Sequence, residues 1–338
     1  MKYNYLGKTE LKVSELCLGT MTFGRETDEQ TAIAMIDRFE EVGGNFIDTA
    51  DAYGSKPGLS EEIVGKVLKG RRQNFILTTK VNFPTGAGPN DRGLSRVHIM
   101  QAIDASLKRL QTDYIDIYFI HCWNSKTPLK DSLFTLDNLV KSGKVRYLGA
   151  SNFTAWKLMK ALGISDRFGW QRFVCFEPQY SLVMRHIEPE FFPLCQEEGL
   201  GIVAWSPLGG GFLSGKYLPG KELAPDSRIA SVEKREDYRE KSEDSWKKRA
   251  TEQNFRILEE MGKIAKKQGK SFAQIALSWI RAKLEITAPI IGARTMAQLE
   301  DNLGCIGWGL TEEELKILDE VSSNEEFYPY RFINKFGW

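Results

Sequence analysis

The sequence predicts an α/β protein built as a closed (β/α)8 barrel, the TIM barrel. Eight short apolar segments recur along its 338 residues. Most are apolar throughout rather than alternating, as expected of strands buried on both faces of a parallel sheet. Amphipathic helical segments separate them. This alternation is typical of α/β proteins, and about eight repeated units favour a barrel over a doubly wound sheet, which is the structural alternative.

The predicted elements follow one another regularly from the first residues on. The opening stretch YNYLGKTELKVSEL has a Gly-Lys turn between two strand-like runs, so we expect a β-hairpin at the floor of the barrel. Apolar residues at the helical period predict helices, among them 29–42, 95–111 and 251–269. The segments expected to form barrel strands are 15–20, 45–50, 75–80, 115–121, 145–151, 174–180, 201–206 and 289–294.

Composition and charge disfavour several classes of function. A formal net charge of +1 gives no electrostatic argument for binding nucleic acid or a membrane surface. The five cysteines form no CxxC pair and fit free thiols in a reducing compartment. Neither a secretory signal nor an apolar run of membrane-spanning length is visible. We therefore expect a cytoplasmic protein with a single domain over 1–338, either a monomer or a homo-oligomer.

Two segments depart from the alternation of strand and helix. Residues 221–250 are charged, poor in apolar side chains and placed after the seventh predicted strand. They form either a solvated, partly disordered excursion or a mobile flap over a ligand, because loops on this side of a barrel build the site. The tail 327–338 is half aromatic, and it could cover the substrate mouth, dock on another subunit or pack on the barrel.

The carboxyl ends of the strands carry the candidate chemistry, because these ends point at the active site of a barrel. The second strand ends at Asp48, with Tyr53 a few residues on; the third ends at Lys80 and the fourth at His121. Taken singly, each has a simpler interpretation as a turn cap, a packing residue or a structural hydrogen-bonding residue. Together they place an acid, a phenol, an amine and an imidazole on one rim, where Asp48 and Lys80 supply each other's counter-charge.

These four residues resemble the Asp, Tyr, Lys and His tetrad of the aldo-keto reductase superfamily. The resemblance runs from about residue 5 to 325 and extends to the branches of potassium-channel β subunits and aryl-alcohol dehydrogenases. It is carried, in family order, by NFIDTADAYG, ILTTKV, DIYFIHCWN, GASNF, EPQYS, WSPLGGGFLSGK and IGARTMAQLEDN.

The resemblance implies an NADPH-dependent carbonyl reductase. The reduced nicotinamide would deliver hydride to an aldehyde or ketone carbon, and Tyr53 would protonate the oxygen. Lys80, balanced by Asp48, would lower the pKa of Tyr53 from about 10. His121 would orient and polarise the carbonyl.

The resemblance also assigns residues to the cofactor. Ser151, Asn152 and Gln179 would hold the nicotinamide carboxamide, and Trp205 would stack on its ring or fill the core. Arg294 would pair with a 2′-phosphate, which favours NADP over NAD, or be an ordinary cation at a helix start. The other positions assigned to the cofactor are Thr20, Met21, Ser206, Pro207, Leu208, Gly209, Gly210, Lys216, Arg228, Gly292, Gln298, Asp301 and Asn302.

The stretch from Gly210 to Tyr217 has the Gly-x4-Gly-Lys spacing of a phosphate-binding Walker A loop. Tyr217 stands where that loop needs Ser or Thr to hold magnesium. We interpret the stretch instead as a glycine-rich cradle for a dinucleotide pyrophosphate, with a charge from Lys216 and no metal.

Two other functions use some of the same residues. A regulatory subunit would keep the fold and the cofactor but serve a partner protein; the potassium-channel β subunits depart from the family at the His position, so His121 weighs against it. A Schiff-base aldolase would use Lys80 as nucleophile, but then the cofactor-like segments would have no role. Phe83 and Trp123 predict an apolar substrate pocket without naming the substrate.

Overall fold

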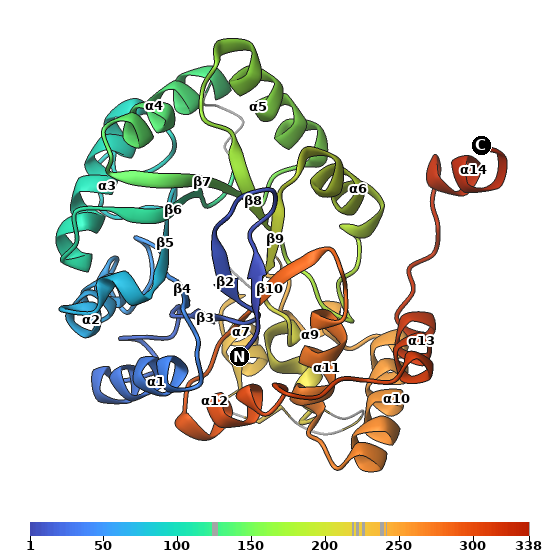
Figure 1. Ribbon diagram of the computed structural model, residues 1–338. Helices are drawn as coiled ribbons and strands as arrows, with labels where there is room; N and C mark the ends of the chain where they lie inside the picture. The colour runs from blue at the N-terminus through green and yellow to red at the C-terminus, as the bar shows by residue number, and fades with distance from the viewer. Residues whose placement is uncertain are drawn as a thin grey trace. The chain divides into compact units, whose positions relative to one another are not determined.

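The computed structural model describes residues 1–123, 128–217, 220, 223–224, 227–236, 240 and 242–337 (Figure 1). The chain folds into two compact units. The first comprises Met1–Pro178, Leu194–Trp205 and Leu284–Glu300. The second comprises Gln179–Pro193, Ser206–Lys283 and the residues from Asp301 onward.

A closed barrel of eight parallel strands forms the centre of the first unit and confirms the predicted (β/α)8 architecture. Neighbouring strands pair in chain order, and the last strand closes the ring by pairing with the first, Ile290 opposite Cys17. The strands are β3 (Cys17–Gly19), β4 (Phe46–Asp48), β5 (Ile76–Val81), β6 (Ile115–Ile120), β7 (Val145–Ser151), β8 (Phe173–Glu177), β9 (Gly201–Ala204) and β10 (Ile286–Ile291).

Each barrel strand overlaps its predicted segment, and the largest differences in boundaries are in β8 and β10. Strand β8 ends at Glu177 rather than at residue 180, and β10 begins at Ile286 rather than at residue 289. Almost every strand residue is buried, as the continuous apolar runs predicted. The first shift matters for the site, because it makes Glu177 the strand end.

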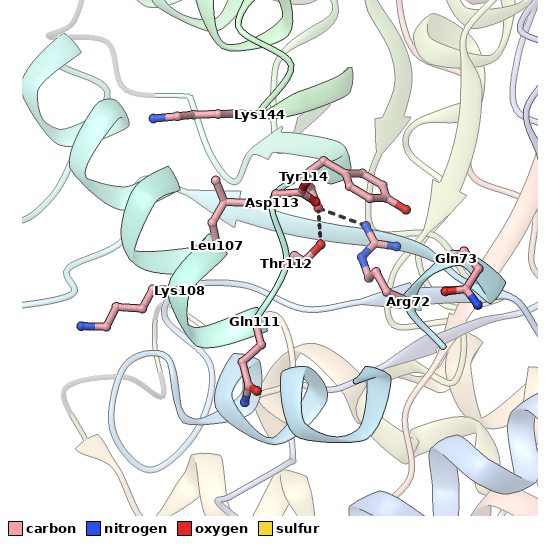
Figure 2. Close-up of a pocket in the computed structure, with 9 residues that line it drawn as sticks. All are labelled: Arg72, Gln73, Leu107, Lys108, Gln111, Thr112, Asp113, Tyr114 and Lys144. Carbon is pink, nitrogen blue, oxygen red and sulfur yellow. Dashed lines mark hydrogen bonds between the residues drawn. The ribbon is translucent and has the colours of Figure 1, made fainter. Parts of the chain in front are cut away.

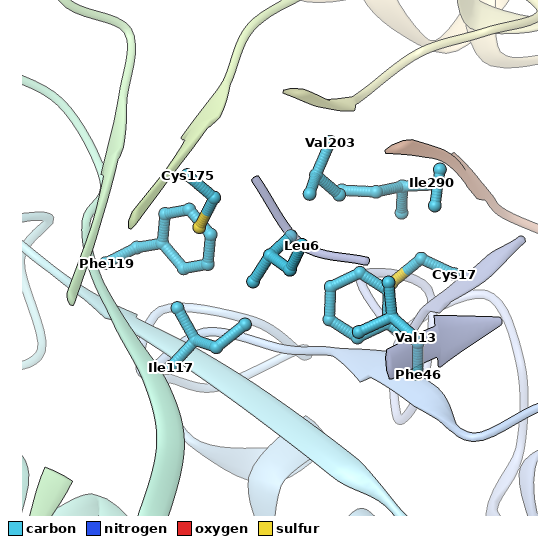
Figure 3. Packing of buried hydrophobic residues seen from close by; sticks show 10 residues of the cluster. Leu6, Val13, Cys17, Phe46, Ile117, Phe119, Cys175, Val203 and Ile290 are labelled. Carbon is cyan, nitrogen blue, oxygen red and sulfur yellow. The ribbon is translucent and has the colours of Figure 1, made fainter. Parts of the chain in front are cut away.

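The predicted hairpin at the start of the chain is present. Strands β1 (Tyr3–Tyr5) and β2 (Lys12–Ser14) pair antiparallel. Leu6 and Val13 of this hairpin pack in one buried cluster with residues that begin β3 and β4 (Figure 3). Burial of such side chains stabilises the fold by roughly 1.5–3 kcal/mol each. The hairpin therefore closes the amino-terminal end of the barrel.

Helices connect successive strands in the first unit, and Figure 1 shows them outside the ring of strands. Their starts are capped: Asp28 accepts the backbone N–H of Thr31, and Ser95 accepts that of His98. The helices between β3 and β8 are α1 (Glu29–Glu41), α2 (Leu59–Leu68), the short η1 (Arg72–Asn74), α3 (Arg96–Leu110), α4 (Leu129–Lys141) and α5 (Ala155–Phe168).

The second unit is helical. Its core includes Tyr180 and Trp279, whose rings stack with centroids 5.4 Å apart. Capping boxes start two of the helices, at Ser271 and Thr311. The elements from residue 188 onward, apart from β9 and β10, are α6 (Glu188–Glu198), η2 (Gly209–Ser214), α7 (Arg228–Glu233), α9 (Trp246–Arg249), α10 (Glu252–Gln268), α11 (Phe272–Arg281), α12 (Met296–Leu303), α13 (Glu312–Val321) and α14 (Tyr330–Phe336).

The two segments singled out in the sequence differ in burial. The described parts of 221–250 contain α7 and α9 and bury Ile229 and Val232, so they are not simply a solvated excursion. In the tail, the aromatic side chains of α14, such as Phe332, are exposed. Within the described residues, none of the helices has the length and apolarity that crossing a membrane requires.

Candidate active site

Lys80 and Asp48 form a buried ion pair at the carboxyl end of neighbouring strands. The ammonium of Lys80, on β5, donates to Asp48 Oδ1 at the end of β4 and to the carbonyl of Thr49 at 3.1 Å. Asp48 also accepts the hydroxyl of Thr78 at 2.5 Å. Burial alone would lower the pKa of Lys80, but the carboxyl groups of Asp48 and Glu177 outweigh it and raise that pKa above its usual value. The amine is therefore held as ammonium.

Glu177 brings a second carboxyl group to the same ammonium. Its Oε1, at the end of β8, lies 3.4 Å from Lys80 Nζ, and both side chains are buried. Burial and the charge of Asp48 raise the pKa of Glu177 well above its usual value, against the opposing effect of Lys80. Glu177 was not predicted as a site residue, because the sixth strand was predicted to run on to residue 180. If the strand had been predicted to end at Glu177, the expectation that strand ends carry the site residues would have included Glu177.

Tyr53 lies in the turn that follows β4, beside this cluster. The centroid of its ring is 5.2 Å from Lys80 Nζ and 5.7 Å from the ring of His121. Burial raises the pKa of Tyr53; Lys80 lowers it, and Asp48 and Glu177 raise it further, so the net direction is upward. The expected net lowering is therefore wrong, because desolvation, together with the carboxyl groups of Asp48 and Glu177, outweighs the ammonium.

His121 follows β6 and faces the same cluster. Its backbone N–H donates to Val81 at 3.0 Å, and its carbonyl accepts the amide of Asn152 at 2.8 Å. Burial and then the charge of Lys80 lower the pKa of His121 well below its usual value. The imidazole is therefore neutral and has one N–H to donate. Its Nδ1 is buried with no hydrogen-bond partner in the described part of the chain.

Comparison with known proteins identifies the family to which these residues belong. The model of the aldo/keto reductase family matches residues 15–323. The chain belongs to the aldo/keto reductase family.

Its relatives within the family carry different names. It is 41% identical to an uncharacterized oxidoreductase, YrpG, of Bacillus subtilis, over 95% of this chain and 96% of that protein. It is 34% identical to a probable voltage-gated potassium channel subunit beta of Arabidopsis thaliana, over 90% of this chain and 91% of that one. It is 31% identical to norsolorinic acid reductase of Aspergillus flavus, over 96% of this chain and 81% of that one.

The strand ends of this aldo/keto reductase also hold the residues predicted for the nicotinamide. Ser151 donates to the carbonyl of Glu177 at 2.8 Å, and the amide of Asn152 donates to Ser151 Oγ at 3.0 Å. Asn152 has a left-handed backbone, with φ of 53°. The amide N–H groups of Asn152 thus tie together the ends of β6 and β7, and a cofactor contact of this residue remains a prediction.

Three further predicted cofactor residues lie on the first unit. Thr20 is buried, and its hydroxyl donates to the carbonyl of Asp48 at 3.0 Å; Met21, the next residue, is half-buried. Trp205 packs partly against the core cluster, and its indole N–H is buried with no partner in the described residues. The core-filling interpretation of Trp205 is therefore confirmed in part, while its stacking on a nicotinamide remains a prediction.

The residues predicted for the adenosine end follow β10. Gly292 and Gln298 are exposed, and the Gln298 side chain accepts the backbone N–H of Arg294 at 2.9 Å. On α12, Asp301 Oδ1 accepts the amide of Gln274 at 3.0 Å, and Asn302 is buried.

The glycine-rich stretch of the second unit is a run of left-handed residues. Gly209, Gly210 and Gly211 have φ of 57°, 67° and 88°, and the hydroxyl of Ser206 accepts the N–H of Gly210 at 3.0 Å. Pro207 is buried and Leu208 half-buried.

The end of the same stretch is built for packing. Tyr217 is buried, and its ring stacks on Phe212 at 5.8 Å, which explains why no Ser or Thr stands there. Lys216 is exposed, and its Nζ lies 5.4 Å from the Tyr217 ring. This packing supports the interpretation that the stretch is not a damaged Walker A loop.

Arg228, predicted as a phosphate contact, has a protein partner. It begins α7, and its Nε donates to Asp244 at 2.7 Å, while Arg249 binds the other oxygen of Asp244 at 3.2 Å. Burial would raise the pKa of Asp244, but the two guanidinium groups lower it below its usual value. Arg228 thus anchors the segment after η2, and a role in phosphate binding remains a prediction.

The two residues predicted for the substrate pocket differ in their surroundings. Phe83 is 40% exposed, and its ring meets the edge of the His121 ring at 4.5 Å. Trp123 packs against Phe153 at 5.5 Å, and Lys157 Nζ lies 4.7 Å from its ring. Phe83 therefore contacts the tetrad directly.

A surface cavity of about 810 Å³ lies at the opposite, amino-terminal ends of β5, β6 and β7 (Figure 2). Two of the cations that line it have partners within the protein: Arg72 donates to Asp116 at 2.6 Å, and Lys144 donates to Asp104 at 2.5 Å. Arg72 and Thr112 both donate to the Tyr114 carbonyl. These two charges are paired, and the cavity lies at the opposite end of the barrel from the carboxyl ends of the strands. We therefore do not assign a catalytic site there.

Proposed function

We propose that this aldo/keto reductase is an NADPH-dependent oxidoreductase that reduces aldehydes or ketones to alcohols. One observation carries the proposal: the Lys80 ammonium, held by Asp48, lies 5.2 Å from the ring of Tyr53, whose other neighbour is His121. An acid, a charge to stabilise its conjugate base and a hydrogen-bond donor therefore meet at one strand-end cluster. General acid catalysis of carbonyl reduction needs these three groups.

Tyr53 is the proton donor in this proposal. Its raised pKa keeps the phenol protonated at neutral pH, which suits a group that must give a proton. As the O–H proton moves to the carbonyl oxygen, the Lys80 ammonium stabilises the phenolate that remains. The neutral His121 donates a hydrogen bond to the same oxygen and polarises the carbonyl.

The residues present fit a dinucleotide. When bound, the reduced nicotinamide supplies the hydride. In the first unit, Ser151, Asn152 and Trp205 would hold the nicotinamide; the indole N–H of Trp205 has no partner among the described residues and would be available to a ligand. In the second unit, Gln179 has a buried amide nitrogen with no partner in the described residues. The left-handed glycines of η2 leave backbone free of side chains, as anion binding requires.

The test is loss of NADPH absorbance with a panel of aldehydes, ketones and quinones, for the protein and for Tyr53→Phe. Removal of the phenol should reduce turnover by roughly 10²- to 10⁴-fold, because the general acid is lost. Binding of NADPH, measured by quenching of protein fluorescence, should be retained. Full turnover of the variant would contradict the role of Tyr53.

A second candidate is a regulatory subunit that binds NADPH with little turnover. The relative named as a potassium channel subunit beta favours it. The neutral His121 and the charged Lys80 beside Tyr53 weigh against it, because a site without catalysis has no need of them. NADPH binding without oxidation by any carbonyl of the panel would favour this candidate.

A Schiff-base aldolase agrees poorly with the structure. Its nucleophile would be a neutral, accessible amine. Lys80 is fully buried, bonded to Asp48, and its pKa is raised. Borohydride trapping of a carbonyl compound on Lys80 would overturn this argument.

A further inference from the structure

Two carboxyl groups meet one ammonium inside the barrel, and their hydrogen bonding is unequal. Asp48 accepts from Lys80 and from Thr78. Glu177 faces Lys80 at 3.4 Å, and its Oε2 is buried with no hydrogen-bond partner among the residues that the structure describes. The ammonium can neutralise only one of the two carboxylates. Glu177, with fewer donors, is the less stabilised anion of the two.

The electrostatic surroundings of Glu177 come from several strands. Burial and Asp48 favour its neutral form, and Lys80 favours its ionised form. Because of its raised pKa, Glu177 loses its proton only as the pH rises, and it then adds a negative charge to the cluster. The titratable or charged groups that interact with this charge are Cys17 on β3, Asp48 on β4, Tyr53 after β4, Lys80 on β5 and Cys175 on β8.

We propose that Glu177 is a positioning residue that acts through Lys80: its ionised carboxyl offsets the ammonium and keeps the Tyr53 phenol protonated. Lys80 favours the phenolate of Tyr53, whereas a carboxylate beside Lys80 favours the phenol. The catalytic consequence rests on the proposed role of Tyr53 as proton donor. The effect of Glu177 on the titration of Tyr53 does not depend on that role.

The sign of the effect follows from these charges. Glu177→Gln keeps the size of the side chain and removes its charge, so that Lys80 and Asp48 remain to act on Tyr53. The phenolate becomes more favourable, and Tyr53 deprotonates at lower pH. Carbonyl reduction, which needs the phenol, should then decline at lower pH than in the natural protein. Oxidation of an alcohol, which needs the phenolate as base, should begin at lower pH.

The direct test is a titration of tyrosinate absorbance in the protein without cofactor. The chain has 11 tyrosines, so Tyr53 is isolated by subtracting the same titration of a Tyr53→Phe counterpart. We expect roughly tenfold more tyrosinate at a given pH in Glu177→Gln than in the natural protein, equivalent to one pH unit. Coincident titrations, or one displaced to higher pH, overturn the proposal.

Glu61→Gln is the matched control. Glu61 is also a fully buried carboxyl, but it binds Arg109 and Thr79, each at 2.6 Å, instead of Lys80. It should leave the titration of Tyr53 where it is in the natural protein. An equal displacement in both variants would show a general loss of buried charge and would overturn the specific role of Glu177.

Two further measurements keep the inference separate from the proposed function. If Glu177→Gln does not fold, Glu177→Met, also uncharged and of similar length, should displace the Tyr53 titration in the same direction. The pH profile of NADPH oxidation then tests catalysis: its basic limb should move to lower pH in the Gln variant. Absence of turnover in the natural protein would refute the proposed function, while the cofactor-free titration would still decide the role of Glu177.

Discussion

At Lys80, one ammonium group meets two carboxyl groups and the ring of Tyr53 within the barrel. Its side chain is fully buried, so solvent screens these charges little. The pKa values of the neighbours follow from this crowding: those of Tyr53 and Glu177 are raised, and that of His121 is lowered. The charge of a single cation thus acts on the pKa values of a phenol, an acid and an imidazole.

Lys80→Met should destabilise the protein strongly, because it leaves Asp48 without its cation. Breaking a buried pair on one side costs about 3–5 kcal/mol. Chemical denaturation should show a decrease of that order in the free energy of unfolding. The double variant Lys80→Met with Asp48→Asn removes both charges and should recover part of the loss. A double variant no more stable than the single one would contradict the idea that the unpaired charge causes the loss.

The four residues of the tetrad could be predicted from the sequence because strand ends in a barrel converge by topology alone. Their pKa values could not be predicted in the same way. The ammonium of Lys80 was expected to decide the pKa of Tyr53, but burial, together with the carboxyl groups of Asp48 and Glu177, decides its direction. Both depend on tertiary packing, and the carboxyl of Glu177 lies far along the chain from Lys80.

At the scale of elements, the ends of the strands were harder to predict from the sequence than their positions. In β10, Pro289 lies inside the strand, beside an irregular register between Ile286 and Ala288. Proline usually marks the start or edge of a strand, so its place inside β10 is unusual. In β8, the predicted segment continued through Pro178 and Gln179 to residue 180, past the true strand end at Glu177. The hydrophobic pattern of the sequence predicted where each strand lies. Hydrogen bonding between neighbouring strands determines where each strand ends.

In the glycine run of η2, the backbone and the neighbours of Gly210 disfavour any side chain. Gly210 has φ of 67°, and a Cβ built on it would lie 2.5 Å from the Asp244 carboxyl. Gly210→Ala should therefore combine backbone strain with a clash and destabilise the protein by about 1–3 kcal/mol. Gly269→Ala is the matched control, since Gly269 has φ of 61° with open space around it.

The difference between these two alanine variants isolates the clash. Thermal unfolding should show a larger loss for Gly210→Ala than for Gly269→Ala. Equal losses would mean that Asp244 yields easily and that backbone strain alone accounts for both.

At the scale of the whole molecule, the eight repeated strand and helix segments predicted the barrel before any single residue was assigned to a site. The charged segment 221–250 was harder to interpret, because some of its buried residues, such as Asp244 and Arg249, are themselves charged. A pattern of charges indicates solvent exposure unless the partners are known. The pair of Asp244 and Arg249 is 5 residues apart and closes only when the segment folds.

The choice between NADPH and NADH should affect the stability of the whole protein. A ligand that binds only the folded state stabilises it by RT ln(1 + [L]/Kd), about 2.7 kcal/mol at 100-fold excess over Kd. If Arg294 pairs with the 2′-phosphate, NADPH should raise the unfolding temperature more than NADH at equal concentration. Arg294→Ala should bring the NADPH value down to that of NADH, while leaving the NADH value unchanged, because NADH has no phosphate for the guanidinium to bind. Equal stabilisation of the natural protein by both nucleotides would refute the role of Arg294, whatever the turnover.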